Sequence, residues 1–233
     1  MAVRLDKYLA DSGKATRSEA RNIIKSGRIS VDGCVVTRPE TRIDEKSLVE
    51  MDGLTIGGSK FIYIMMNKPA GVLSATEDSS QPTVTDLLSD DMKVRGLFPV
   101  GRLDKDTTGL LLLTNDGDFA HRVISPRSHV KKRYLAETDG TPTKEDSVRF
   151  ENGITLADGT VCLPASLDIV GENRCIVTVV EGKYHQVKRM LASCGKPVVK
   201  LHRLSIGGLE LDNQLAEASY RELKPEELNF IFV

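Results

Sequence analysis

The chain has 233 residues, of which 40% are hydrophobic and 28% charged, and its formal net charge is -1. These proportions are ordinary for a soluble globular protein, and the length allows one large domain or two modest ones. Four cysteines without a C-x-x-C pair argue against a zinc site or a redox pair, and neither a signal peptide nor a run long enough to cross a bilayer is visible, so we expect a cytoplasmic protein.

Two short helices and a hairpin are expected in the first 36 residues. Apolar residues at helical spacing indicate a helix that starts near Leu5 and ends at Ser12-Gly13. A second helix begins after Thr16, which can form a capping box with Glu19, and Asp32-Gly33 predicts a tight turn between two short strands. Residues 37–60 are mixed in composition and are expected to end the small domain and form a hinge.

Positive charge is concentrated in this N-terminal segment. Residues 1–28 hold seven Lys or Arg and three acids, which gives a net charge of +4. A basic helix face is most often simply solvated, but Arg17, Arg21 and Lys25 lie four positions apart beside the expected hairpin, which suits the phosphates of an RNA backbone. The candidate RNA-contacting residues of this segment are Arg4, Lys7, Arg17, Ser18, Arg21, Lys25 and Arg28.

A loop and a buried strand organise the rest of the chain. Residues 101–109 are polar, have glycine at both ends and carry Asp104; four consecutive leucines, 110–113, then predict a strand buried on both faces. An earlier strand, 61–66, is expected to stop at the turn Asn67-Lys68-Pro69-Ala70-Gly71. Catalytic groups often lie on a loop held by such a scaffold, although a lone aspartate is more often a solvated loop acid.

Two later stretches contain no acid. The first stretch is 119–136. A helix is expected over 118–124, and a strand that follows Lys132 carries Tyr134. Taken by itself, Tyr134 is most simply interpreted as a core tyrosine. Residues 183–209 contain a helix with its apolar face at 187, 190 and 191, and then a strand near 200–207. Between them, a helix with Pro142 at its first position, a hairpin over 154–163 and a strand over 175–180 are expected to be structural.

Several of these segments resemble known families. Residues 3–50, with R-L-D-K-Y-L and R-S-E-A-R-x-x-I-K-S-G-R-I-x-V-D-G, resemble the S4 RNA-binding module. The stretch G-R-L-D-x-x-T-x-G-L-L-L-L-T-N-D-G resembles the active-site motif of the pseudouridine synthases, and N-K-P-x-G, K-x-Y and H-Q-V-K-R occur around it in that family's order. The motif Y-H-Q-V-K-R-M is similar to that of the RsuA-type branch, which acts on small-subunit rRNA. The large-subunit branch tends to have Asn-Arg in place of Tyr184-His185.

The resemblance implies a role for each motif. Asp104 would be the catalytic carboxylate, kept charged by Lys188, where most relatives carry arginine. Tyr134 would stack on the target base, Leu201 would pack beneath it, and Arg102 would support the site. No dinucleotide, P-loop, zinc-protease or serine-hydrolase motif occurs, so neither a cofactor nor a metal is expected. Further RNA contacts are implied at Lys68, Lys132, His185, Arg189 and Arg203.

We therefore expect an α+β protein of two domains. Residues 1–59 would form an S4 RNA-binding domain with its linker, and residues 60–233 a pseudouridine synthase domain with a mixed, mostly antiparallel sheet. The expected activity is isomerisation of a uridine of 16S rRNA, at the family's site uridine 516, by a monomer that acts on the free rRNA or on a small-subunit assembly intermediate and not at a membrane. Two alternatives remain: the same reaction on 23S rRNA, or a non-catalytic RNA-binding or ribosome-assembly protein.

Overall fold

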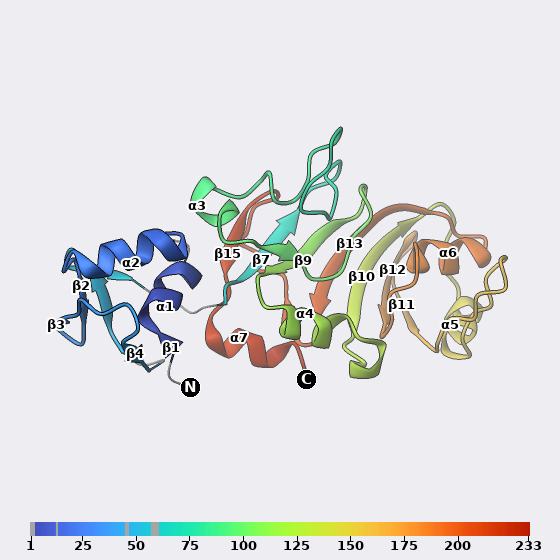
Figure 1. The fold of residues 1–233 in the computed structure, drawn as a ribbon. Coiled ribbons are helices and arrows are strands. Elements are labelled where there is room, and N and C mark those ends of the chain that lie inside the picture. The colour runs from blue at the N-terminus through green and yellow to red at the C-terminus, as the bar shows by residue number, and fades with distance from the viewer. Residues whose placement is uncertain (1–2, 13, 45–46, 57–60) are drawn as a thin grey trace. The chain divides into compact units, whose positions relative to one another are not determined.

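The chain folds into two compact units, residues 1–61 and 62–233, in a computed structural model (Figure 1). Each unit has buried hydrophobic side chains of its own. The structure describes residues 3–12, 14–44, 47–56 and 61–233. Among the described residues no helix is long and apolar enough to span a membrane.

The first unit packs two helices against a four-stranded sheet. Helix α1 spans Leu5–Asp11 and α2 spans Arg17–Lys25. The expected capping box is present, because Thr16 Oγ1 accepts from the Glu19 amide while the Glu19 carboxylate accepts from the Thr16 amide. The strands are β1 (Val3–Arg4), β2 (Ile29–Val31), β3 (Cys34–Val35), β4 (Arg42–Ile43), β5 (Val49–Met51) and β6 (Leu54–Ile56); β1 pairs with β4, and the larger sheet has the order β3-β2-β5-β6.

The segment expected to be a hinge contributes to this fold. Strands β5 and β6 pair with each other, and β5 also pairs with β2, so the sheet continues to Ile56. Val49 and Ile56 are buried in the same core as Leu5 and Ile24, which is why the chain is ordered here rather than extended as a linker. Residues 37–60 were expected to end the small domain and to form a hinge. As far as Ile56 they are part of this unit's fold, and 57–60 lie outside the described residues.

The second unit is built on one nine-stranded mixed sheet, as the α+β fold class predicts. Its main order is β11-β12-β10-β13-β9-β7-β15, and of the strand pairs only β13 with β9 is parallel among the described residues. The strands are β7 (Tyr63–Lys68), β8 (Phe98–Pro99), β9 (Thr108–Thr114), β10 (Lys132–Thr138), β11 (Ser166–Gly171), β12 (Arg174–Val179), β13 (Val198–Ile206), β14 (Leu209–Glu210) and β15 (Tyr220–Glu222).

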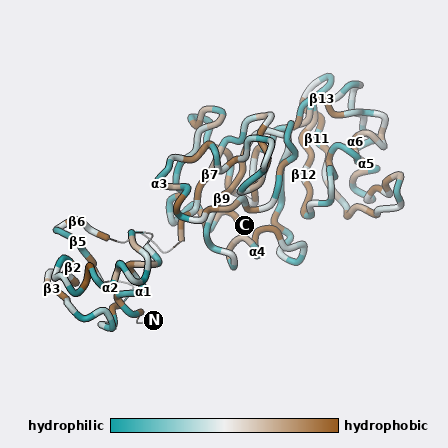
Figure 2. Tube along the Cα trace, turned by 45° about the horizontal axis from the view of Figure 1, so that its top comes forward, coloured by the Kyte–Doolittle hydropathy of each residue, from teal (hydrophilic) through white to brown (hydrophobic). Residues whose placement is uncertain are grey.

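Strand β9 lies in the middle of this sheet and is buried on both faces. Leu110 and Leu112 pack into one apolar cluster and Leu111 and Leu113 into another, and all four are at most 1% exposed. This confirms the strand predicted from the four leucines. The hydrophobic (brown) stretches in Figure 2 include β7 and β9, which are neighbouring strands of this sheet.

Helices cover both faces of the sheet and several begin at side-chain caps. They are α3 (Asp90–Lys93), α4 (Gly117–Ile124), the 3-10 turn η1 (Pro126–Ser128), α5 (Lys144–Glu151), α6 (Gln186–Ser193) and α7 (Pro225–Phe230). Helix α5 begins two residues later than expected, because Thr143 and Asp146 form its capping box and Pro142 precedes it. The expected hairpin over 154–163 is reduced to one bridge between Thr155 and Val161.

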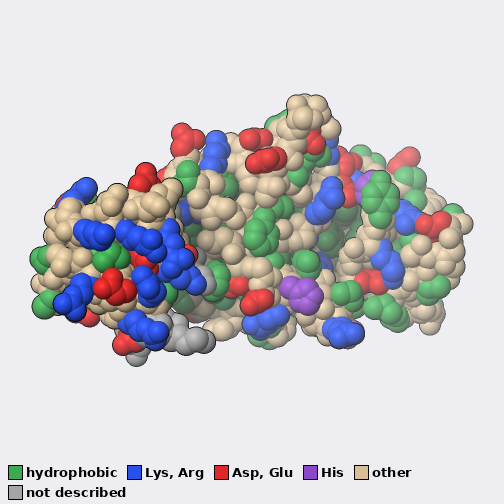
Figure 3. Space-filling view, in the orientation of Figure 1, with side chains coloured by type: hydrophobic (Ala, Val, Ile, Leu, Met, Phe, Trp, Pro, Cys, Tyr) green, Lys and Arg blue, Asp and Glu red, His purple; other side chains and the backbone are tan. Residues whose placement is uncertain are grey.

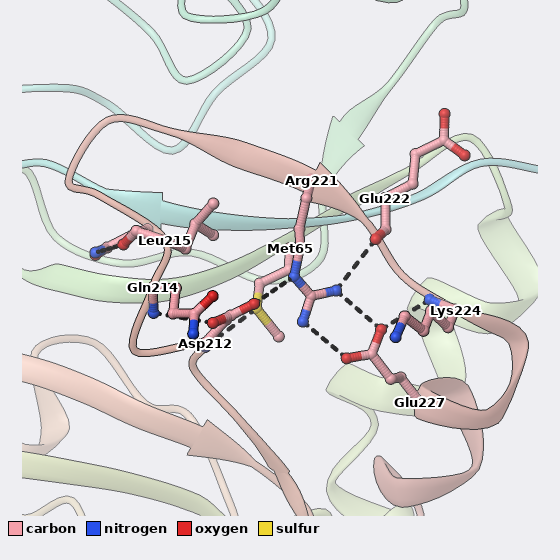
Figure 4. A network of polar contacts seen from close by, with 9 residues as sticks. Met65, Asp212, Gln214, Leu215, Arg221, Glu222, Lys224 and Glu227 are labelled. Carbon is pink, nitrogen blue, oxygen red and sulfur yellow. Dashed lines mark hydrogen bonds and ion pairs between the residues drawn. The ribbon is translucent and has the colours of Figure 1, made fainter.

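The C-terminal segment closes the sheet edge beside β7. Arg221 on β15 donates hydrogen bonds to Asp212 and, through two nitrogens, to Glu227 at the first turn of α7 (Figure 4). Glu227 also accepts from the Lys224 amide, so the same carboxylate caps the helix and pairs with the strand. A bidentate arginine–carboxylate pair fixes orientation as well as distance, and it holds α7 against the edge strand.

Candidate active site

Hydrogen bonds from the turn at residues 67–71 hold the loop that carries Asp104. The Lys68 side chain is fully buried, and its Nζ donates hydrogen bonds to the carbonyl oxygens of Pro69, Lys105 and Thr107 at 2.9, 3.3 and 3.0 Å. The Gly71 amide donates to the Lys105 carbonyl as well. Because the ammonium has only three protons, Lys68 is fully used in holding this loop. Burial lowers the pKa of Lys68 to about 8, although Asp106 and Asp104 oppose the shift.

Two nitrogen-bearing side chains, one from the residue before α6 and one from α6 itself, flank the Asp104 carboxylate. Lys188 Nζ lies 3.2 Å from Asp104 Oδ2, and His185 Nε2 lies 3.4 Å from Asp104 Oδ1. Lys188 Nζ also donates to Asp106 Oδ1 at 2.5 Å. Burial by itself would lower the pKa of Lys188, but the hydrogen bonds to Asp106 and Asp104 outweigh it and raise that pKa above its usual value. Lys188 therefore stays charged and favours the ionised carboxylate.

A buried acid positions the segment that precedes α6. Glu181 accepts hydrogen bonds from the Leu163 amide, from Gln186 Nε2 and from Lys183 Nζ, with which it forms an ion pair. Burial would raise the pKa of Glu181, but these donors outweigh it and lower that pKa. Gln186 in turn accepts from the Lys183 amide, so the turn that delivers His185 and Lys188 is fixed at both of its ends.

A small pocket of about 80 Å³ opens beside Asp104. Its wall includes Tyr134 from β10 and Leu201 from β13, and Leu201 is directly opposite Ala136, two residues along the same face from Tyr134. Thr107 also lines the pocket, and its hydroxyl is buried without a hydrogen-bond partner. The remaining lining residues are Arg102, Leu103, Val179, Glu181, Gly182, Lys183, His185, Gln186, Val187 and Lys188.

Three residues expected to contact RNA are buried instead. Lys68, Lys132 and Arg203 are 0%, 9% and 3% exposed. Arg203 donates to the Leu110 carbonyl at 2.7 Å and to Tyr134 Oη at 3.4 Å, so it ties β13 to β9 and to the tyrosine of the pocket. Burial, with Arg203 nearby, lowers the pKa of Lys132 to about 8. A basic sequence stretch does not distinguish side chains on the two faces of a strand, which is why these placements differ from the expectation.

Other predicted residues lie near the pocket. Arg102 is exposed on its rim, whereas Arg189 is held in an ion pair with Asp158 at 2.6 Å and also donates to the Tyr184 carbonyl. Among the described residues no group of three His, Cys, Asp or Glu side chains is arranged to hold a metal ion.

The basic residues of the first unit are organised by one buried acid. Asp6 is fully buried and accepts hydrogen bonds from Arg4 and Arg21, and Arg17 lies within 3.9 Å. The three arginine side chains remain 44–56% exposed, so each contacts Asp6 and is still partly accessible to solvent. Figure 3 shows Lys and Arg side chains gathered on one face of this unit. The hydrogen bond from Arg4 is the main cause that lowers the pKa of Asp6 to about 2, with Arg21 and Arg17 adding to it.

Family models agree with this division of the chain. Residues 62–193 match the model described as RNA pseudouridylate synthase, and residues 3–49 match the S4 domain. The first match covers more than half of the chain and contains Asp104, Tyr134 and Lys188. The chain belongs to the RNA pseudouridine synthase family. It is thus an isomerase with an S4 RNA-binding domain at its N-terminus, and the alternative of a non-catalytic RNA-binding or ribosome-assembly protein is set aside.

Individual pseudouridine synthases match along nearly their whole length. The uncharacterized RNA pseudouridine synthase YtzG of Bacillus subtilis is 44% identical, over 98% of this chain and 98% of its own. Proteins named ribosomal small subunit pseudouridine synthase A are 44% identical in Vibrio parahaemolyticus, over 99% of this chain and 100% of theirs, and 38% identical in Escherichia coli, over 97% and 98%. A crystal structure of a pseudouridylate synthase superimposes with a TM-score of 0.70 at 34% identity, over 98% of this chain and 99% of that one.

The site of this pseudouridine synthase contains residues that sequence reasoning did not select. Asp106 shares Lys188 with Asp104, Glu181 fixes the turn before α6, and Thr107 lines the pocket. The acid at 106 was visible in the loop, but its link to Lys188 depends on a contact between distant segments. Glu181 stands at the end of a β-strand pattern and carried no motif signal of its own.

Proposed function

We propose that this enzyme converts one uridine of 16S rRNA to pseudouridine, with uridine 516 as the target position. The observation that carries the proposal is the Asp104 carboxylate, which is held against Lys188 in a pocket walled by Tyr134 and Leu201. Support for the small-subunit substrate comes from relatives of that name and from Tyr184-His185 at the positions where the large-subunit branch tends to have Asn-Arg.

The reaction needs a carboxylate and no net reagent. Uridine and pseudouridine are isomers: the N1–C1′ bond breaks, the C5–C1′ bond forms, and the proton on C5 is exchanged for one that the product carries on N1. An ionised carboxylate next to C1′ can take up the positive character that develops on the sugar, by covalent attack or by removing a proton from C2′. We assign this role to Asp104, with Lys188 as the cation that keeps it ionised in a partly buried site.

Tyr134, Leu201 and Arg102 receive supporting roles in this proposal. The target nucleotide must leave its stack before C1′ can reach Asp104, which costs a few kcal/mol. Tyr134 and Leu201 offer an aromatic face and an apolar floor to the extruded base, and Arg102 at the rim is placed to meet its phosphate. Arg203, through its hydrogen bond to Tyr134 Oη, acts as a positioning residue rather than as the RNA contact first expected.

The assignment of the two parts of the chain follows from the same proposal. Residues 1–59 would bind the rRNA backbone and residues 60–233 would perform the isomerisation, in a monomer that acts in the cytoplasm on the rRNA or on a small-subunit assembly intermediate. The phosphate contacts of the first part are assigned to the arginines anchored by Asp6, to the basic side chains beside them and to one serine hydroxyl. These residues are Arg4, Lys7, Arg17, Arg21, Lys25, Arg28 and Ser18.

Tritium release from RNA labelled at C5 of uridine tests this function. We expect release from 16S rRNA or from small-subunit intermediates by the unmodified chain and none by Asp104→Asn. Asp106→Asn is the matched control, because it removes a carboxylate from the same loop and the same lysine but leaves Asp104 in place. Release by Asp104→Asn would exclude Asp104 from the reaction, and release from 23S rRNA alone would exclude the proposed substrate.

A further inference from the structure

An exposed aromatic pair stands at the mouth of the pocket. The rings of Tyr184 and His185 are stacked, with centroids 3.9 Å apart and planes 17° apart. Tyr184 is 76% exposed, the highest fraction among the described tyrosines, although a large ring gains little from standing in water. One face of the Tyr184 ring is covered by His185, and among the described residues no other aromatic ring stacks on it.

Several contacts hold this pair in place. His185 has φ 47° and ψ 34°, a left-handed conformation that costs energy for a residue with a side chain and that therefore needs support. His185 Nε2 approaches Asp104, and the Tyr184 carbonyl accepts a hydrogen bond from Arg189, which is itself paired with Asp158. The stack is thus fixed before any ligand arrives, so little rotamer freedom remains to be lost when a third ring is added.

We propose that the face of Tyr184 opposite His185 binds the base of the nucleotide next to the target uridine by stacking. This inference rests on the proposed function. A stacked base matches the ring in shape and chemistry, and base–aromatic stacking is the common way in which proteins hold single-stranded RNA. The base is not the target itself, because the target must lie in the pocket beside Asp104, and Tyr184 is not among the residues that line that pocket.

The surroundings favour RNA over a protein segment as the ligand of this face. No acid occurs in the chain from residue 183 to residue 209. Among the described residues, the acids that reach residues 183–189 from elsewhere are each paired with one of the cations there: Glu181 with Lys183, Asp104 and Asp106 with Lys188, and Asp158 with Arg189. His185 contacts both Asp104 and Tyr184, which places the flanking base one ring beyond the residue that touches the catalytic carboxylate. Stacking there would fix the strand on one side of the extruded nucleotide and so stabilise the extruded state.

The experiment combines protein variants with altered RNA. Binding of a small-subunit rRNA fragment is measured for the unmodified chain, Tyr184→Ala and Tyr184→Phe, with the fragment intact or abasic at the nucleotide 5′ or 3′ to the target. We expect Tyr184→Ala to weaken binding of intact RNA by about 5- to 100-fold and Tyr184→Phe by less than about twofold, because phenylalanine keeps the stacking face. On the RNA that is abasic at the stacked position, the three proteins should bind alike.

A fluorescent base gives a second readout that does not depend on turnover. 2-Aminopurine at the stacked position should be quenched by the unmodified chain and by Tyr184→Phe but not by Tyr184→Ala. Two results would overturn the proposed stacking on Tyr184. One is an equal loss of binding affinity for Tyr184→Ala on the intact RNA and on both abasic RNAs, and the other is quenching that persists in Tyr184→Ala. Failure of the proposed function appears separately, as absent tritium release by the unmodified chain, whereas failure of this inference leaves that release intact.

Discussion

Lys188 Nζ bridges two carboxylates of one loop, Asp104 at 3.2 Å and Asp106 at 2.5 Å. The lysine comes from α6 and the acids from the loop before β9, so the bridge joins two parts of the sheet unit that are far apart in sequence. The partners differ in exposure: the Asp104 side chain is 26% exposed and that of Asp106 is 75% exposed. Lys188 thus stabilises the charge of the more buried acid while the outer acid holds the ammonium in position.

Loss of the cation at position 188 should impair turnover more than folding. We expect Lys188→Gln to lower kcat by about 10- to 100-fold, or about 1.4–2.7 kcal/mol, because the carboxylate loses its partner, while Lys188→Arg keeps most of the activity. Single-turnover tritium release measures the effect. Lys93→Gln, at an exposed lysine paired with Asp90, is the control and should be neutral. Full activity of Lys188→Gln would contradict the role of the bridge.

Removal of the buried ammonium at position 68 should loosen the catalytic loop. Lys68→Met leaves three carbonyl groups without their donor, so we expect the free energy of unfolding to fall by about 2–4 kcal/mol and the activity to fall with it. Urea titration measures the stability, and amide exchange at residues 103–108 measures the loop. Lys131→Met, at an exposed position, should change neither. Unchanged exchange in Lys68→Met would argue against the loop being held this way.

A glycine permits the parallel contact between β9 and β13. A Cβ on Gly109 would lie 2.4 Å from the Arg203 carbonyl oxygen, and its φ of +98° is unfavourable for any other residue. We expect Gly109→Ala to lower the free energy of unfolding by about 3 kcal/mol or more, measured by thermal unfolding. Gly117→Ala is the control, because nothing lies within 4 Å of its Cβ and it starts α4. Equal melting temperatures for the two variants would refute the argument.

The buried acid of the first unit should make its stability depend on pH. The pKa of Asp6 is about 2 in the folded unit and near 3.8 when unfolded, so its ionised form favours folding. This contribution is present above about pH 4 and is lost as the pH falls through 2. The stability difference between the unmodified chain and Asp6→Asn should therefore shrink across that window. Urea-dependent amide NMR signals from residues 3–56 measure it, and a constant difference would contradict the linkage.

The arginines on Asp6 should dominate the salt dependence of RNA binding. Arg17→Gln with Arg21→Gln should weaken binding and reduce the slope of log K against log salt by about 0.7 for each lost contact with a single-strand phosphate. Both residues stay about half exposed while they contact Asp6, so their outer nitrogens are free for such contacts. Lys93→Gln with Lys144→Gln, two exposed lysines of the other unit, serve as the control pair. An unchanged slope in the arginine variant would exclude the patch from RNA binding.

Local sequence patterns determined much of this protein. The capping box at Thr16, the tight turn at Asp32-Gly33 and the doubly buried leucine strand depend on neighbours within a few positions, so each could be predicted from spacing alone. Family motifs added the pairing of Asp104 with Lys188, and the structure places those side chains 3.2 Å apart.

Only the tertiary structure decided which side chains face inward and what they meet. The basic stretches gave no sign that Lys68 and Arg203 are buried, because the direction of a side chain depends on the strand face and on the segments packed against it. The same holds for β5 and β6 in the expected hinge, for the link of Asp106 to Lys188 and for the stack of Tyr184 on His185. Each follows from how the chain packs locally or over long range, and sequence periodicity records only how one segment alternates between the core and the solvent.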